Sequence, residues 1–397
     1  MNFDFDAVIV GAGPVGSTIA YYLSIEGLNV ALIDKKKQIG YPLQCAGILS
    51  KHILDANELP ESVVLNTVNG AFLHTQNHIL NVKNETPVAY VIDRVAYDEF
   101  LLSRSVENGV EFINQKVIDV DDEKGITYLS NNREILSKVI IGCDGYNSLL
   151  SRCMGNSQNN FPASQMLVEI DDGDMKAFRN SNENVEDYVD AYLLNDILPG
   201  FLWIIPVKDN KYRIGLFSNQ NHKIQNEILK EFLNDNFDYK IIEKYKGFIP
   251  IFDNQNRLVK NRLLLMGDAA SQVKPTSGGG LLVAFDACKM AVKHVVEAIG
   301  RDDMNVLNGY EKEFKNKYLK EFNYQFKVQK TLNLLSDEDL DYLFLKLREN
   351  DCEQLISEYG DMDTQSKLVK EFIKRGLIFK IMPTFLFKKV ANIFGFR

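Results

Sequence analysis

Two glycine-rich motifs, about 250 residues apart, constrain the fold of this chain more than any other feature. The first, GAGPVG at residues 11–16, follows an apolar run at residues 7–10 and precedes a segment of helical character at residues 17–23. A second apolar run at residues 29–33 ends in Asp34, which lies 18 residues after Gly16. This order of strand, glycine turn, helix, strand and acid is typical of a dinucleotide-binding unit.

Each residue of the first motif has its own predicted role. Gly11 permits the tight turn, Gly13 lets the backbone approach a pyrophosphate, and Gly16 lets the helix and strand pack closely. The N-terminus of the helix offers free N–H groups to the same pyrophosphate. Asp34 is placed to accept hydrogen bonds from ribose hydroxyls. The alternative is a tight turn without a ligand, which does not require Asp34.

The second motif begins with GDAA at residues 267–270 and continues through Pro275 to the glycine triplet at residues 278–280. Because the triplet has no Cβ atoms, this loop can lie against the planar ring of a flavin. A helix starting near Leu281 would point its positive end at that ring. A flexible turn before a helix explains neither Asp268 nor Pro275. Together the motifs predict the two ends of one bound FAD, with the ADP half at the first motif and the flavin half at the second.

Between the two motifs the pattern changes from alternating strands and helices to mostly strands. A helix is predicted at about residues 95–108, and residues 263–266 read as a buried strand before a long apolar helix at 281–299, closed by Gly300. From about 166 to 251, short alternating runs are separated by turn residues, as in a mostly antiparallel sheet. Further strands are predicted at residues 71–74, 79–82, 88–92, 110–113, 116–120, 138–141, 188–194, 201–205 and 212–217.

These patterns predict an α/β protein with three parts. A discontinuous, doubly wound FAD-binding domain comprises residues 1–65, 93–160 and 255–300. An inserted, mostly antiparallel β-sheet substrate domain comprises residues 66–92 and 161–254. Residues 301–397 form a helical C-terminal region that ends in a basic amphipathic tail.

Composition narrows the function. The net charge of −9 argues against nucleic-acid binding. The five cysteines show no CxxC spacing, and the five histidines form no HxxxH or HExxH pair, so the sequence predicts neither disulfides nor a metal site. With no signal peptide before the first strand and no apolar run of about 18 residues, a cytoplasmic protein is expected.

The C-terminal tail departs from this acidic balance. Residues 372–397 carry six basic side chains and no acid, interleaved with hydrophobic residues. Such a tail suits contact with an anionic membrane surface, on the inner face of the cytoplasmic membrane. A terminal helix packed on the body, with its lysines in solvent, fits the pattern equally well.

The motifs resemble the FAD-dependent enzymes of the para-hydroxybenzoate hydroxylase type. Besides the two glycine motifs, the run CDG at residues 143–145, with Ser148 and Arg152 after it, matches in order. The resemblance implies that Asp268 lies at the ribityl or pyrophosphate region of the cofactor. It also places Arg94 near the cofactor, whereas the alternative for Arg94 is a helix residue paired with Asp98.

Within that fold the chain is most similar to the geranylgeranyl reductase family. Residues 42–50, PLQCAGILS, resemble the family's P-x-x-C-x-x-G-L-S segment, and residues 201–206, FLWIIP, with Gly215 beyond them, resemble Y-x-W-x-F-P followed by a distant glycine. The likeness spans roughly residues 1–300. Ile48 stands at a family glycine and narrows the space beside the flavin, while Phe201 replaces the family's tyrosine.

The resemblance implies specific site residues. Cys45 is implied beside the flavin, as a contact or a proton relay, against the alternative of a buried small hydrophobe. Phe201, Trp203 and Pro206 are implied as substrate contacts, with Trp203 either walling an apolar channel or filling the core. The implied cofactor-binding residues are Gly11, Gly13, Pro14, Val15, Gly16, Asp34, Cys45, Ala46, Ile48, Arg94, Val117, Asp144, Gly267, Asp268, Pro275, Gly278, Gly279, Gly280 and Leu281.

The implied activity is hydrogenation of C=C bonds in geranylgeranyl chains of archaeal-type lipids or prenyl diphosphates. Hydride from reduced flavin goes to the tertiary carbon and a proton to the CH carbon. With no second dinucleotide motif, the electron donor is NADPH bound transiently, a ferredoxin-like protein or another low-potential carrier. The alternatives are a flavin monooxygenase or halogenase acting on an aromatic substrate, and a non-catalytic flavoprotein that transfers electrons or binds a partner.

Overall fold

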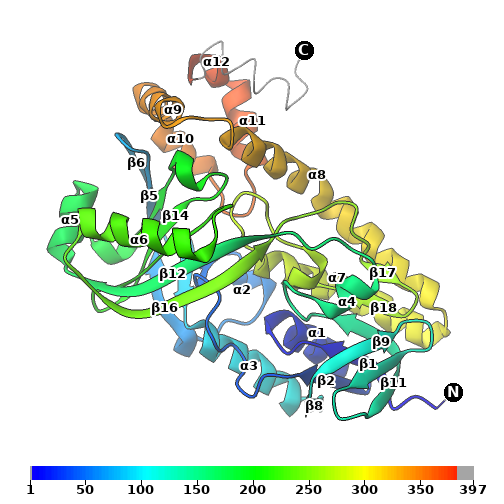
Figure 1. Cartoon of the computed structure of the whole chain (residues 1–397). Coiled ribbons are helices and arrows are strands. Elements are labelled where there is room, and N and C mark those ends of the chain that lie inside the picture. Colours follow the sequence, from blue (N-terminus) through cyan, green and yellow to red (C-terminus); the bar gives the residue numbers. More distant parts are fainter. Residues whose placement is uncertain (1, 382–397) are drawn as a thin grey trace.

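The computed structural model describes residues 2–381, and it is organised around three sheets. Figure 1 shows a nucleotide-binding half near the N-terminus, a β-rich half beside it, and C-terminal helices above both. The predicted α/β architecture, with its inserted β-sheet and helical C-terminal region, is confirmed. No helix within residues 2–381 has both the length and the apolar character needed to cross a bilayer.

The first sheet forms the nucleotide-binding half. Its central strands β1, β2, β8, β11 and β18 are parallel, with β1 between β2 and β11, so the chain turns to opposite sides of β1. A crevice at the carboxyl ends of such strands is where α/β folds bind ligands. The strands are β1 (Phe5–Val10), β2 (Val30–Asp34), β8 (Glu111–Asn114), β9 (Val117–Asp121), β10 (Ile126–Leu129), β11 (Glu134–Gly142), β17 (Val259–Lys260) and β18 (Leu263–Leu265).

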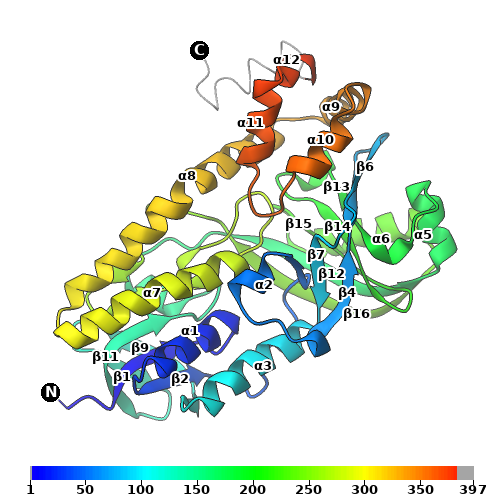
Figure 2. The same ribbon diagram turned by 180° about the vertical axis from the view of Figure 1, so that it is seen from behind.

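Three long helices cover one face of this sheet, as Figure 2 shows. Helix α1 (Pro14–Ile25) lies between α3 (Arg94–Glu107) and α7 (Leu281–Arg301) and buries its apolar residues against β1 and β2. The predicted stop of α7 at Gly300 is wrong: the helix continues to Arg301, and Asp302 ends it in the left-handed conformation, φ 52°. Aspartate tolerates that conformation because its short side chain can bond locally.

The second sheet is antiparallel except where β13 pairs with β5. Its strands, in spatial order, are β16 (Tyr239–Pro250), β12 (Asn160–Ile170), β15 (Lys211–Phe217), β14 (Leu202–Lys208), β13 (Tyr188–Tyr192), β5 (Gly70–His74) and β6 (Ile79–Lys83). Helices α5 (Asp172–Arg179) and α6 (His222–Asn236) belong to this half, and the strand pattern did not predict them. Leu229 and Leu233 show why α6 forms, since apolar residues four apart share one helix face.

A small third sheet joins the two halves. It contains β3 (Ile48–Ser50), β7 (Ala89–Ile92) and β4 (Val64–Val68), and thus mixes segments from both sides of the predicted domain limits at residues 65 and 92. The domain limits themselves stay a prediction. The short elements nearby are α2 (Ile53–Ala56), α4 (Leu149–Cys153), and the 3₁₀ turns at Glu61–Val63, Val185–Asp187, Asn195–Ile197, Gly267–Ala270 and Met304–Leu307.

The C-terminal helices pack on the rest of the molecule. Helix α8 (Asn308–Leu332) runs from the nucleotide-binding half to α9 (Asp337–Glu349), α10 (Cys352–Tyr359) and α11 (Ser366–Lys374), which lie at the edge of the second sheet (Figures 1 and 2). Helix α12 (Leu377–Ile381) is the last described element. The predicted membrane-binding tail at residues 372–397 lies mostly outside the described residues.

Candidate functional site: one cavity from the glycine motifs to the C-terminal helices

The first glycine motif forms the turn between β1 and α1. Gly11 has φ 103°, and a Cβ on Gly16 would lie 1.8 Å from the Gly11 carbonyl oxygen, so both positions require glycine. A Cβ on Gly13 would meet nothing within 4 Å, because that position faces the open cavity. Asp34, at the end of β2, accepts the backbone N–H of Ala12 at 2.8 Å and also lines the cavity. The turn is therefore closed on its inner side and open on its ligand side, as a pyrophosphate requires.

The second motif reaches the same cavity from β18. Asp268 lies in the 3₁₀ turn Gly267–Ala270, and no group within residues 2–381 donates a hydrogen bond to its carboxylate. Desolvation by the surrounding protein raises the pKa of Asp268 to about 6, and the charge of Arg94 opposes this shift. The Asp268 side chain is nevertheless exposed to the cavity. The loop then passes Gly278 to Gly280 and starts α7, whose first turn has no side-chain cap. An unpartnered carboxylate and free helix N–H groups suit a cofactor that brings both hydroxyls and acceptors.

Arg94 forms the predicted pair with Asp98, and its cofactor contact stays a prediction. Its guanidinium forms an ion pair with Asp98 at 2.9 Å, yet it also lines the cavity and acts on Asp268. Burial lowers the pKa of Arg94, but the Asp98 carboxylate and the neighbouring Cys45 raise it by more, and the net shift is upward. Arg94 therefore keeps its positive charge beside Cys45 and the second motif.

Cys45 and Ala46 lie on a segment that the second sheet holds in place. Buried Arg213, from β15, donates to the Ala46 carbonyl at 3.0 Å. Gln165, from β12, accepts the Trp203 indole N–H at 2.9 Å and donates to the Cys45 carbonyl at 3.4 Å. The predicted cofactor-facing cysteine and the predicted substrate-facing tryptophan are thus joined through one glutamine.

The Asp144 carboxylate already accepts hydrogen bonds from the start of α4. It accepts the Ser148 hydroxyl at 2.5 Å and the Leu149 N–H at 2.7 Å. Burial raises the pKa of Asp144 despite these bonds. Asp144 and Val117 both line the cavity, so their cofactor contacts stay a prediction.

The structure brings most of the predicted residues to one cavity of about 1780 Å³. The predicted residues on its wall are Gly11, Gly13, Pro14, Val15, Asp34, Cys45, Ala46, Ile48, Arg94, Val117, Asp144, Asp268, Gly278, Gly279, Gly280, Leu281, Phe201 and Trp203. Gly16, Gly267, Pro275 and Pro206 are buried behind the wall. Gly16 allows close backbone packing, and Gly267 has φ 63° beside the Val15 side chain. Pro206 and Pro275 do not line the cavity, so their predicted contacts with substrate and cofactor find no support here.

Part of the cavity wall consists of apolar side chains, and we call this part the apolar chamber. Aliphatic side chains of the second sheet line one side, including Leu73, Val189 and Leu193, and side chains of the C-terminal helices line the other, including Phe344 and Ile356. No sequence motif marks this part of the wall. Such a chamber accepts a long hydrocarbon and offers it few hydrogen bonds.

The chain is similar to known proteins in sequence and in structure. A family model described as the FAD binding domain matches residues 4–317. Digeranylgeranylglycerophospholipid reductase 1 of Methanococcoides burtonii is 31% identical, over 89% of this chain and 90% of that protein. An uncharacterized protein of Methanocaldococcus jannaschii is 30% identical, over 96% of this chain and 99% of that protein.

Solved structures agree in fold. A geranylgeranyl bacteriochlorophyll reductase-like protein of Thermoplasma acidophilum superposes with a TM-score of 0.83 at 24% identity, covering 98% of this chain and 99% of the other. The halogenase PltM superposes less well, with a TM-score of 0.67 at 17% identity, over 94% and 84% of the two chains. The predicted cofactor and family are confirmed, and the chain belongs to the geranylgeranyl reductase family of FAD-dependent oxidoreductases.

Proposed function

We propose that the protein hydrogenates C=C bonds in the geranylgeranyl chains of archaeal-type membrane lipids or prenyl diphosphates. The observation that carries this proposal is the continuity of one cavity of about 1780 Å³ from the two glycine motifs to the apolar chamber. A cavity of this kind brings a long hydrocarbon to the flavin while excluding bulk water. The similarity to named digeranylgeranylglycerophospholipid reductases supports the same substrate class.

The residues divide the work along the cavity. At the nucleotide end, Gly13 and the N-terminus of α1 hold the pyrophosphate, and Asp34 holds a ribose. At the centre, Asp268 binds the flavin half, and the N-terminus of α7 stabilises negative charge on the reduced ring. Reduced FAD supplies the hydride there. Beyond it, Trp203 and Phe201 begin the apolar wall along which the prenyl chain lies.

A proton must reach the second alkene carbon, and Cys45 is the side chain that we assign to the flavin edge. It lines the cavity between Arg94 and the Trp203 wall, where it contacts the ring or passes the proton. The hydride goes to the tertiary carbon and the proton to the CH carbon, so both electrons and both hydrogens of the new C–H bonds are accounted for.

The donor and the cellular location belong to the same proposal. The chain has no second dinucleotide motif. The flavin is therefore reduced by transiently bound NADPH, by a ferredoxin-like protein or by another low-potential carrier. All five cysteines are free, as suits the reducing cytoplasm. The basic tail at residues 372–397 then holds the enzyme at the inner face of the membrane, where its lipid lies.

Mass spectrometry of the lipid tests the activity. The purified holoenzyme is incubated with dithionite and an unsaturated digeranylgeranyl phospholipid without oxygen. We expect a gain of two mass units for each reduced bond, absent without enzyme. If the lipid keeps its mass while the flavin is demonstrably reduced, the proposal is wrong. Oxygen, NADPH and aromatic substrates would then test the monooxygenase and halogenase alternatives.

A further inference from the structure

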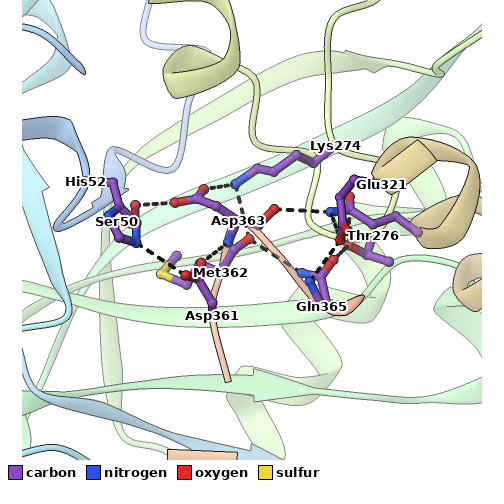
Figure 3. Close-up of polar contacts among 10 residues, drawn as sticks. Ser50, His52, Lys274, Thr276, Glu321, Asp361, Met362, Asp363 and Gln365 are labelled. Carbon is purple, nitrogen blue, oxygen red and sulfur yellow. Dashed lines mark hydrogen bonds and ion pairs between the residues drawn. The ribbon is translucent and has the colours of Figure 1, made fainter. Parts of the chain in front are cut away.

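A short segment between α10 and α11, residues 360–365, crosses the cavity wall near the flavin-facing loop. We call it the C-terminal strap. Gly360, Asp361, Met362, Asp363 and Gln365 all line the cavity, so this segment is part of the site and not an outer connection. Figure 3 shows its polar side chains meeting side chains from the end of β3, from the loop after Asp268 and from α8.

The centre of this cluster is an ion pair between Asp363 and Lys274. The Lys274 ammonium contacts one carboxylate oxygen of Asp363 and donates to the Met362 carbonyl at 3.1 Å, while the Ser50 hydroxyl donates to the other carboxylate oxygen at 2.5 Å. The side chain of Lys274 is only 8% exposed. Burial raises the pKa of Asp363, but Lys274 and Ser50 lower it more, so the net shift is downward. Asp363 is therefore a charged carboxylate that pairs with Lys274, and both side chains are largely shielded from bulk water.

Lys274 is also part of the flavin-facing loop. Its backbone N–H donates to the Gly279 carbonyl at 3.2 Å, and its carbonyl accepts the Gly278 N–H at 3.0 Å. Its side chain runs back along the triplet, because a Cβ on Gly279 would lie 3.2 Å from the ammonium nitrogen. The ammonium is thus held directly against the glycines that face the flavin.

Several neutral hydrogen bonds fix the strap to the same loop and to α8. Thr276 donates to the Gln365 side chain at 3.0 Å, and Gln325 donates to the Asp363 carbonyl at 3.2 Å. His52 pairs with Asp361 at 3.2 Å, and ligand atoms of His52, Asp361 and Asp363 lie within 4.8 Å of one another. Lys274 already balances Asp363 in this group, so the cluster is explained without a cation.

We propose that Asp363 is a positioning residue for the flavin, which holds the Lys274 ammonium against the glycine triplet and balances its charge there. Reduction adds negative charge to the flavin, and an unbalanced charge nearby in a low-dielectric cavity shifts the reduction potential. Together the two charges largely cancel at the flavin. If only the lysine remains, its positive charge favours the reduced flavin. If only the aspartate remains, its negative charge opposes reduction. This inference rests on FAD as the cofactor and not on the identity of the lipid.

The test is a double-mutant cycle read by the flavin reduction potential, measured on holoprotein without lipid by equilibration with reference dyes. We expect Asp363→Asn to shift the potential to more positive values and Lys274→Met to more negative values. The double variant should return close to the parent potential. Lys293→Met is the matched control, because it removes an exposed ion pair between Lys293 on α7 and Glu313 on α8. This variant should leave the potential unchanged.

Shifts of both single variants in one direction, or no shift in either, would overturn the proposal, because a purely structural role does not follow the sign of the charge. If a single variant fails to retain FAD, the double variant decides. It removes both charges together and must regain FAD, and its failure to do so also counts against the pairing. A negative lipid assay leaves these potentials unaffected, so the two proposals fail separately.

Discussion

The nucleotide end of the cavity is built from backbone, whereas the lipid end is built from side chains. At the first end, the backbone at the glycines and helix N-termini has one allowed conformation. A Cβ added to Gly16, for example, would lie only 1.8 Å from the Gly11 carbonyl oxygen. At the second end, residues such as Leu193 and Phe344, from distant segments, need only be apolar and of suitable size. A polar, charged cofactor requires fixed directions, and a hydrocarbon requires volume.

The sharpest test of this difference compares two glycines of one motif. Gly16→Ala should destabilise the fold by about 3 kcal/mol or more, because the new methyl group overlaps backbone. Gly13→Ala should change the stability of the cofactor-free protein by no more than about 0.5 kcal/mol, because its Cβ meets open space. It should nevertheless weaken FAD binding. Denaturant unfolding of the cofactor-free proteins measures both, and equal losses of stability would contradict the distinction.

Asp268→Ala tests the flavin end directly. Loss of a charged hydrogen-bond partner costs about 1.5–3 kcal/mol, which corresponds to roughly ten-fold to a hundred-fold weaker FAD binding. Asp235→Ala, at an exposed position on α6, is the matched control and should keep its flavin. Flavin content from the absorption spectrum is the measurement. A yellow Asp268→Ala protein with one flavin per chain would show that this carboxylate does not hold the cofactor.

At the lipid end, a larger side chain that reduces the cavity volume near Trp203 should impair the reaction. Ala191, on β13, lines the cavity, and Ala191→Phe places a ring in the chamber. A misfit of even one methylene in a substrate pocket costs about 1–3 kcal/mol, so lipid reduction should fall by at least about ten-fold. FAD content should be unchanged. Ala191→Ser, which hardly alters the volume, is the control, and normal turnover in the phenylalanine variant would place the lipid elsewhere.

Cys45 lies where the two ends meet. Cys45→Ala should retain FAD, with an altered spectrum and slower lipid reduction. A loss beyond about a hundred-fold would identify the thiol as the proton donor, and a smaller loss would identify it as a ring contact. Cys153, which lies off the cavity, serves as the matched Cys→Ala control. An unchanged rate and spectrum would return Cys45 to a purely structural role.

The smallest expected effect is a pH dependence of the cofactor-free protein. The pKa of Asp268 is raised from 3.8 to about 6 in the fold, so the folded chain retains a proton that the unfolded chain releases. The stabilisation from this proton is complete below 3.8 and is lost as pH rises through about 6. The difference in unfolding free energy between the parent and Asp268→Asn should therefore change across this window. A constant difference from pH 4 to 7 would contradict it.

The same difference between the two ends explains what the sequence could predict. Gly11 and Gly13 could be predicted because the backbone turn requires glycine at a fixed spacing, and Asp34 follows them at the spacing of a ribose-binding acid. The resemblance to a known family then indicated Asp268. The apolar wall was missed because Phe344 and Ile356 satisfy no such demand and come from helices whose faces could equally pack on the body. Pro206 was assigned to the substrate by resemblance alone, and it lies buried behind Trp203's wall.

Lys274 and Asp363 were missed for a related reason. They lie 89 residues apart, and only the fold of the C-terminal helices brings them together. A lysine beside a glycine triplet does not indicate a function by itself, because the acidic residue that pairs with it cannot be identified from the sequence. Helix α6 was missed because the surrounding alternation of strands obscured its four-residue spacing.

The central claim is that the two ends of the cavity serve one reaction, and a single-turnover experiment tests it most directly. The enzyme flavin is reduced without oxygen, excess reductant is removed, and unsaturated digeranylgeranyl phospholipid is added, with the fully saturated lipid as the control. We predict that only the unsaturated lipid reoxidises the flavin, with one bond saturated for each flavin oxidised. A flavin that stays reduced with both lipids, and reoxidises only when oxygen is admitted, would contradict the account.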